Sequence, residues 1–155
     1  MTVDVNELNT FIVRAKAATY VGSGEHVEPS RPGSHDLRFV DGKWAYLDSY
    51  FGGSDFIGQE VVYFEGQPVW AMNYYGYILR PDLIDAAHAG GVIKASLSQL
   101  YTEGRFLGGF EHQADGFAYT DTNQGDAAHF QGKEWITCRG IRVYALVYHG
   151  GLIKG

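Results

Sequence analysis

The sequence predicts an α+β domain, with a curved, mainly antiparallel sheet of six to eight strands that packs an N-terminal helix and a central helical pair on one face. Apolar residues recur at helical spacing near the N-terminus and again between residues 80 and 103, whereas the other apolar segments alternate with a period of two. The 21 glycines are spread among tyrosine, phenylalanine, valine and isoleucine, which is typical of strands joined by tight turns. Such short connections favour antiparallel pairing.

The length of 155 residues predicts a single domain over 1–155 that folds without disulfide or metal crosslinks. Its one cysteine, Cys138, excludes an internal disulfide framework and any multi-cysteine metal site, and it favours a reducing compartment. The N-terminal segment does not have the pattern of a secretory signal, and no stretch approaches the ~20 apolar residues of a membrane span. We therefore expect a cytoplasmic protein with no membrane partner.

The charge distribution argues against nucleic acid as a partner. The formal net charge is -6, and the twelve lysines and arginines are scattered along the chain. A protein that binds the phosphate backbone normally carries a basic stripe. The common nucleotide, metalloprotease and hydrolase motifs are also absent, so the sequence predicts no metal site and identifies no cofactor.

Two segments are predicted to be helical. The first starts after a capping residue, Asp4, and Glu7 follows three positions later, as in a capping box. In the central segment, Pro81 suits a first helical position, and the pair Gly90-Gly91 is expected to divide the segment into two helices.

Three related phrases predict hairpins, because each contains a polar residue followed by glycine between strand-like segments. With Asp41-Gly42 at the centre of the first turn, Arg38 faces Ala45 on the next strand. The uneven spacing of the phrases indicates similar hairpins without a true repeat. The phrases are FVDGKWAY (39–46), YFEGQPVW (63–70) and HFQGKEWI (129–136).

The candidate binding site is centred on the segment 48–76, where aromatic and acidic residues are dense, and it includes residues of the preceding hairpin. Tyrosine and tryptophan offer flat apolar faces with polar tips, and carboxylates supply polar specificity, a combination that suits a small ligand. Asp48 on an inward face needs a cation or hydrogen-bond donors, whereas on an outward face it is a solvated acid. The predicted ligand-binding residues are Arg38, Trp44, Tyr46, Asp48, Tyr50, Glu60, Trp70, Asn73, Tyr74 and Tyr75.

Two C-terminal segments are interpreted as structural. The segment DTNQGDAAH (121–129) contains acidic and amide residues, but their order does not fit a calcium loop, so a polar turn is expected. In the last strand, 141–149, we expect the face with Val143 and Val147 to lie in the core, and the face with Tyr144 and Tyr148 to be amphipathic.

The run YLDSYFGGSDFIGQEVVYFEGQPVWAMNYYG, with SRPGSHDLRF before it and LYTEGRFLGGF after it, resembles a family of small bacterial domains of unknown function. The resemblance extends from about Leu8 to Ile153. Some members of the family follow a helix-turn-helix segment, which suggests a sensing or effector module. No catalytic residue can be carried over from the family, because no activity is established for it.

Three functions are compatible with these features. The favoured one is a small-molecule-binding or sensing module. The alternative is an enzyme, a hydrolase or transferase, in which Glu60, Glu111, His112 or Asp48 would supply acid–base chemistry and Arg38 or Arg105 would hold an anion. The third is an interaction protein in which alternating aromatic strands form a homodimer face.

Overall fold

The structure is a computed structural model that describes residues 2–21 and 24–155. It confirms the α+β class and the antiparallel sheet, but the described residues form nine strands, more than the six to eight predicted. The elements are α1 (Val5–Lys16), the π-helical turn η1 (Ala17–Val21), β1 (Glu25–Val27), β2 (His35–Asp41), β3 (Trp44–Gly52), β4 (Phe56–Phe64), β5 (Gln67–Ile78), α2 (Ala86–Thr102), β6 (Phe110–Ala114), β7 (Phe117–Asp126), β8 (His129–Cys138) and β9 (Ile141–Leu152).

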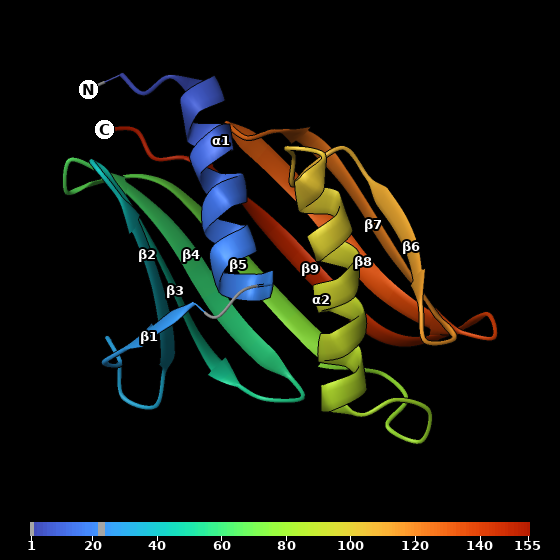
Figure 1. Cartoon of the computed structure of the whole chain (residues 1–155). Helices are drawn as coiled ribbons and strands as arrows, with labels where there is room; N and C mark the ends of the chain where they lie inside the picture. Colours follow the sequence, from blue (N-terminus) through green and yellow to red (C-terminus); the bar gives the residue numbers. More distant parts are fainter. Residues whose placement is uncertain (1, 22–23) are drawn as a thin grey trace.

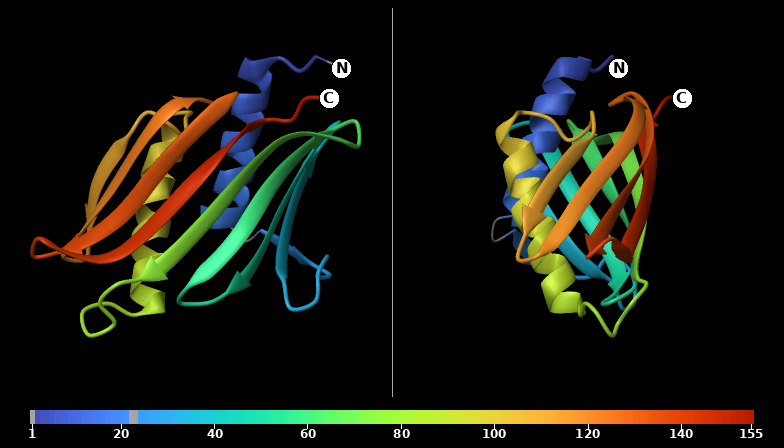
Figure 2. Two further views of the ribbon diagram at one scale, coloured as in Figure 1. Left: turned by 180° about the vertical axis from the view of Figure 1, so that it is seen from behind. Right: turned by 90° about the vertical axis from the view of Figure 1, so that its right-hand side faces the viewer.

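All nine strands belong to one open sheet, in the order β1-β2-β3-β4-β5-β9-β8-β7-β6, and every neighbouring pair is antiparallel. The sheet is strongly twisted and curved, and α1 and α2 lie on its concave side (Figures 1 and 2). The space between the helices and the concave face therefore contains the core and, as shown below, the candidate site.

Helix α1 forms where the sequence predicts it. The Asp4 side chain accepts hydrogen bonds from the backbone N–H groups of Asn6 and Glu7, which would otherwise be unpaired at the helix start. Leu8 and Ile12, four residues apart, are completely buried against the sheet. The next position on the same stripe is Lys16, which is also buried.

The central segment contains one helix, α2, and the prediction of a helical pair is wrong. Gly90 and Gly91 lie inside α2, although glycine costs about 1 kcal/mol relative to alanine in a helix interior. Val92, Leu97 and Leu100 are buried on one face of α2. Packing of this continuous face outweighs the weak helix propensity of the two glycines.

Two of the predicted hairpin details also need correction. The β2–β3 turn is centred on Gly42-Lys43, so Arg38 pairs with Leu47 instead of Ala45. Gly42 has φ 59, which fits the first central position of a type II′ turn. The third phrase forms no turn, because Gly132 lies within strand β8, and its hairpin closes later, at the type I′ turn Arg139-Gly140.

The four strands β2–β5 and the four strands β6–β9 are two copies of one arrangement. Their order in the sheet is mirrored about the β5–β9 pair, where Tyr74 lies opposite Tyr148. The sequence repeats with the same symmetry at an offset of 73 or 74 residues: Tyr-x-Asp at 46–48 recurs at 119–121, and Gly-x-Glu at 58–60 recurs at 132–134. A pseudo-twofold axis therefore passes between β5 and β9. This offset does not relate the three hairpin phrases to one another, so the repeat is one that the phrases do not reveal.

Candidate functional site

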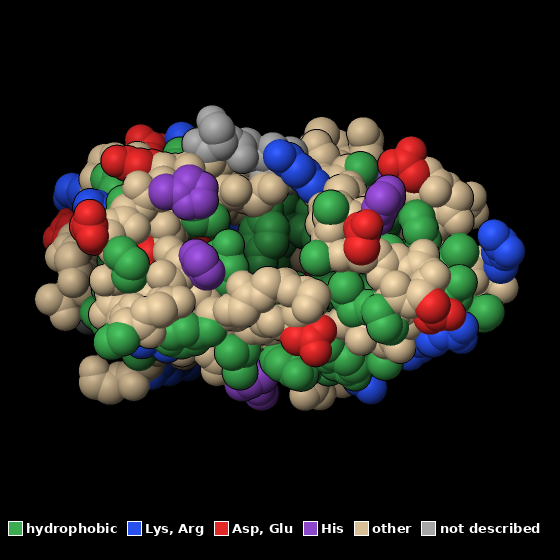
Figure 3. All heavy atoms as spheres, turned by 90° about the horizontal axis from the view of Figure 1, so that it is seen from below, with side chains coloured by type: hydrophobic (Ala, Val, Ile, Leu, Met, Phe, Trp, Pro, Cys, Tyr) green, Lys and Arg blue, Asp and Glu red, His purple; other side chains and the backbone are tan. Residues whose placement is uncertain are grey.

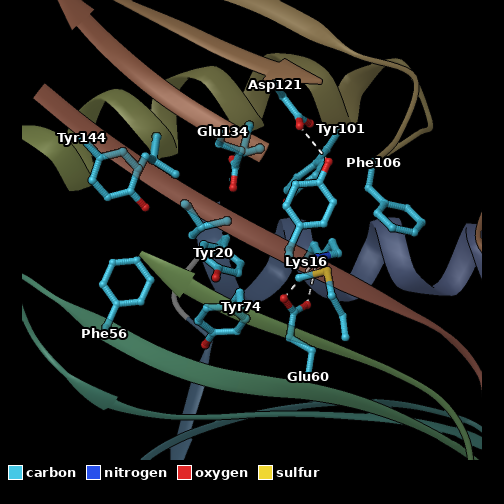
Figure 4. A pocket seen from close by; sticks show the side chains of 15 residues that line it. Lys16, Tyr20, Phe56, Glu60, Tyr74, Tyr101, Phe106, Asp121, Glu134 and Tyr144 are labelled. Atoms are coloured by element: carbon cyan, nitrogen blue, oxygen red, sulfur yellow. Dashed lines mark hydrogen bonds and ion pairs between the residues drawn. The ribbon is translucent and has the colours of Figure 1, made fainter. Parts of the chain in front are cut away.

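A cavity of about 50 Å³ lies between the two helices and the concave face of the sheet. This volume has room for about three water molecules. Three carboxyl groups from the two halves, together with one lysine, face this space (Figure 4). Its polar lining residues are Lys16, Tyr20, Glu60, Tyr74, Tyr101, Asp121, Glu134, Tyr144 and Tyr148.

In the first half of the molecule, an ion pair is buried beside the cavity. The Nζ atom of Lys16 lies 2.9 Å from Oε1 and 3.2 Å from Oε2 of Glu60, whose exposed fraction is 0%. The Tyr46 hydroxyl donates a 2.5 Å hydrogen bond to the same carboxylate. Asp48 lies directly across from Glu60 on the neighbouring strand, and it accepts a 2.6 Å hydrogen bond from the Tyr74 hydroxyl.

The second half repeats the acids and the tyrosines. Asp121 on β7 lies directly across from Glu134 on β8. The Tyr119 hydroxyl donates to Glu134, and the Tyr148 hydroxyl donates a 2.7 Å hydrogen bond to Asp121. Each acid thus has the same tyrosine donor as its counterpart in the first half, but among the described residues no lysine is hydrogen-bonded to the second set.

The surroundings of these acids raise their pKa values. Burial, followed by the nearby Glu60 carboxylate, raises the pKa of Asp48 to about 8. Burial, followed by Asp121, raises the pKa of Glu134 to about 8. For Asp121, burial raises the pKa to about 6 against the lowering effect of the Tyr148 hydrogen bond. Burial therefore favours the protonated forms of Asp48 and Glu134, whereas a cation beside either group would favour its carboxylate form.

The helices repeat as well, at an offset of 81 residues, because the connection after α1 is longer than the one after α2. Tyr20 and Tyr101 are counterparts, and both line the cavity. At the same offset the counterpart of Lys16 is Leu97, which also lines the cavity. Leucine is shorter than lysine and uncharged, so the helix of the second half supplies no cation at this position.

A second difference lies on the central strands, where Trp70 of β5 corresponds to Tyr144 of β9. The Trp70 ring is stacked on Phe130 at 5.8 Å, and its Nε1 donates a 2.9 Å hydrogen bond to the Ala127 carbonyl oxygen. Tyr144 is only 1% exposed, and its hydroxyl has no hydrogen-bond partner among the described residues. The first half is filled at this position, whereas the second half presents an unpaired hydroxyl to the cavity (Figure 4).

Two wider hollows lead from the surface toward the cavity. Their volumes are about 330 Å³ and about 270 Å³, and both are lined by Tyr20, Phe56 and Gly53. Tyr20 and Phe56 also line the inner cavity, so the hollows adjoin the cavity at these two rings. The end of the molecule at which these hollows open has a visible depression, with hydrophobic side chains at the bottom of the depression (Figure 3). We call this opening, formed by Tyr20, Gly53 and Phe56, the mouth.

The structure brings part of the predicted site together. Glu60 and Tyr74 line the cavity, Tyr46 donates to Glu60, and Asp48 and Tyr50 line the larger hollow. Asp48 is an inward-facing acid with a hydrogen-bond donor, and Arg38 is not its partner.

Five predicted residues lie elsewhere. Trp44 packs on Phe11 and Phe64, and Trp70 packs on Phe130. Arg38, Asn73 and Tyr75 are exposed on the convex face. Neighbouring residues of a strand point to opposite faces, so the Tyr75 side chain cannot enter the cavity that Tyr74 lines.

The convergence needed for the alternative catalytic set is not found. Glu111 is exposed on the edge strand β6, and His112 Nδ1 is hydrogen-bonded to Ser96 Oγ at 3.1 Å. Neither lines the cavity that contains Glu60. Arg105 donates to the carbonyl oxygens of its own loop.

Sequence reasoning missed the second half of the site. Asp121 belongs to strand β7 and is buried, so the polar-turn interpretation of 121–129 is wrong at its first residues. In strand β9, the buried tyrosines Tyr144 and Tyr148 face the cavity and Val147 is exposed, the reverse of the predicted orientation at these positions. The signals that identify these residues are the repeated Tyr-x-Asp and Gly-x-Glu patterns.

Comparisons with known proteins give one match. The family model of a domain of unknown function (DUF5680) matches residues 48–153. The matched region contains Asp48, Glu60, Asp121 and Glu134, whereas Lys16 precedes it. No curated protein and no solved structure matches the chain.

Two further results concern the described residues only. No helix in residues 2–21 and 24–155 has the length and apolar character needed to cross a membrane. Within the same residues, no three histidine, cysteine, aspartate or glutamate side chains are grouped as metal ligands would be.

Proposed function

The chain belongs to the DUF5680 family of domains of unknown function, and we propose that it is a binding module that holds a small polar molecule in the cavity between its two halves. The observation that carries this proposal is the Tyr144 hydroxyl, which is buried, faces the cavity and has no partner among the described residues. A buried polar group without a hydrogen bond costs about 1–3 kcal/mol. A bound molecule that pairs with this hydroxyl would remove that cost.

The acids beside the cavity support the same proposal. Carboxyl groups are rarely removed from water, because each must lose its hydration. Here Asp121 is buried and Glu134, opposite it, is half-buried, and their raised pKa values reflect that cost. Strongly shifted carboxyls in a cavity are typical of functional sites. The mouth offers a route from solvent to these groups.

A thermal-shift screen of small metabolites tests the proposal. A ligand at 100 times its dissociation constant stabilises the folded state by about 2.7 kcal/mol. For a chain of this size, that corresponds to a rise in melting temperature of about 5–10 °C.

A blocking variant shows whether a hit binds in the cavity. Ile93 lines both the cavity and the smaller hollow, so Ile93→Trp should obstruct the entrance and remove the shift. The matched control is Ile141→Trp, because Ile141 is exposed and lies outside these pockets. The proposal fails if a broad library gives no shift, or if both variants respond to the hits as the original protein does.

A catalytic role is the second candidate, and it is favoured by the Asp121–Glu134 pair. Two carboxyls on adjacent strands with pKa values of about 6 and about 8 are suited to act as base and acid near neutral pH. The test is to follow a bound compound by NMR over time. Conversion that stops in both Asp121→Asn and Glu134→Gln would support catalysis, and an unchanged spectrum of every bound compound would exclude it.

A homodimer is a further proposal for the convex face. Ile57, Tyr75 and Val147 are exposed and lie side by side on β4, β5 and β9. A second copy that packs on this apolar patch would remove it from water. Light scattering at high concentration tests the proposal, and a monomeric mass throughout would exclude it.

A further inference from the structure

The pseudo-twofold symmetry makes the first half of the site a template for the second. In the first half, Lys16 provides a primary ammonium group, which lies within hydrogen-bond distance of both oxygens of Glu60 and 3.8 Å from the Met72 sulfur. The ammonium is thus held by the protein's own chain at a defined position beside a buried carboxylate. The following inference rests on the proposed function, since it names the class of ligand that the same cavity binds.

The second half has the acceptors for an ammonium group but lacks the lysine. Glu134 corresponds to Glu60, and among the described residues its one hydrogen-bond donor is Tyr119. Asp121 lies across from Glu134, and the unpaired hydroxyl of Tyr144 faces the same cavity. Leu97 stands where symmetry would place a lysine, so among the described residues no cation is hydrogen-bonded to these acceptors. Lys16 is hydrogen-bonded to Glu60, and it acts on Asp121 and Glu134 only through longer-range attraction.

We infer that the cavity binds a small primary amine, whose ammonium group lies beside Glu134, Asp121 and Tyr144 in the position that corresponds to Lys16 Nζ beside Glu60. An ammonium has three N–H donors, and these three side chains offer a matching set of oxygen acceptors. Hydrogen bonds between charged partners are among the strongest in proteins.

Other ligand chemistries fit the site less well. A metal ion requires several ligands grouped around one point, and the described residues contain no such group of acids, histidines or cysteines. An anion in the cavity would be repelled by the acidic side chains of Glu60, Asp121 and Glu134. The lysine that lines the cavity, Lys16, is already paired with Glu60. The cavity of about 50 Å³ limits the buried part of the ligand to the amine and a few carbon atoms. A longer apolar body would extend past the rings of Tyr20 and Phe56 into the mouth.

Calorimetric titration with benzylamine and with benzyl alcohol tests the inference, because the two probes have nearly the same shape and differ in charge. We expect benzylamine to bind at least ten-fold more tightly than benzyl alcohol. Replacing Glu134 by glutamine removes the carboxylate and should weaken benzylamine binding by about 10- to 100-fold, with little effect on benzyl alcohol. The matched control is Glu111→Gln, which makes the same change at an exposed position outside the cavity.

A second variant supplies the lysine that symmetry predicts. Leu97→Lys should place a tethered ammonium beside Glu134 and abolish benzylamine binding by competition. Ala95→Lys is its control, because it adds a lysine to the exposed side of the same helix and should leave binding intact. If Leu97→Lys does not fold, the Glu134→Gln titration decides the question alone.

The outcomes separate this inference from the proposed function. Equal affinities for the amine and the alcohol, or unchanged amine binding in Glu134→Gln, would overturn the amine assignment and leave the binding module intact. If benzylamine does not bind while another compound binds in the cavity, the assignment is equally overturned. If no compound binds in the cavity, both proposals fail.

Discussion

Replacing Lys16 by methionine should strongly destabilise the protein. The side chains of Lys16 and Glu60 are 5% and 0% exposed, so bulk water cannot hydrate the carboxylate once the ammonium is removed, and only the few water molecules that fit in the cavity could reach it. Removing one partner of such a buried pair costs about 3–5 kcal/mol, because the other charge remains buried and unpaired. Domains of this kind unfold with a free energy of about 5–15 kcal/mol, so the loss is a large part of the total. For a chain of this length, the melting temperature should fall by about 6–20 °C.

The assay is chemical denaturation of Lys16→Met beside two comparison proteins. Lys43→Met removes a lysine from the exposed pair with Glu65, whose side chains are 69% and 49% exposed, and it should change stability little. The double variant Lys16→Met/Glu60→Gln removes both charges and keeps an acceptor for the Tyr46 hydroxyl, so it should recover at least half of the loss. If Lys16→Met is no less stable than Lys43→Met, the assignment of a buried charge pair is wrong.

Three further predictions concern pH, backbone space and the unpaired hydroxyl. Burial, reinforced by a neighbouring carboxylate, raises the pKa values of Asp48 and Glu134 to about 8, whereas unfolded acids titrate near 4. The contribution of these two acids to stability is therefore complete below about pH 4 and is lost as the pH rises through about 8. Chemical denaturation should show that the protein is less stable at pH 9 than at pH 6. A protein that is more stable at pH 9 would contradict the raised pKa values. A Cβ atom at Gly132 would come within 2.2 Å of a tyrosine ring atom and 2.8 Å of a backbone carbonyl oxygen, whereas one at Gly91 meets nothing within 4 Å. Gly132→Ala should therefore lower the free energy of unfolding by about 1–3 kcal/mol. Gly91→Ala should raise it by about 0.5–1 kcal/mol. Similar effects of the two changes would refute the packing described for strand β8. Tyr144→Phe removes a buried hydroxyl that has no partner among the described residues. The free energy of unfolding of this variant should be unchanged or higher, and benzylamine should bind it more weakly. A loss of stability would show that the hydroxyl is paired in the free protein.

The sequence predicts which residues share a face of a strand, because strand geometry is a local property. Alternation along β3 places Tyr46 and Asp48 on one face, and both are buried on the concave side. The same rule assigns Tyr74 and Tyr75 to opposite faces, so only one of them can face the cavity. The partner of Arg38 depends on the register of one turn, and shifting that turn by one residue replaces Ala45 by Leu47. Both partners lie on the face of β3 opposite to Asp48, so either register places Arg38 on the convex side.

The second half could not be predicted without the repeat. Asp121 and Glu134 appear as isolated acids until the sequence is compared with itself at the offset that relates them to Asp48 and Glu60. Lys16 follows Ile12 on the buried stripe of α1, and a lysine at that spacing indicates a buried partner, but the helix alone does not show which acid it meets. The partner depends on how α1 crosses the sheet, which is a property of the tertiary structure.

A crystal structure of the protein with 4-bromobenzylamine is the most direct test of the central claim, that symmetry-related acids create a binding position for an amine. The ligand nitrogen should lie within hydrogen-bond distance of the Glu134 carboxylate, and the anomalous signal of bromine should lie in the mouth near Phe56. A ligand bound only on the outer surface, or one whose bromine points inward and whose nitrogen lies in solvent, would contradict it.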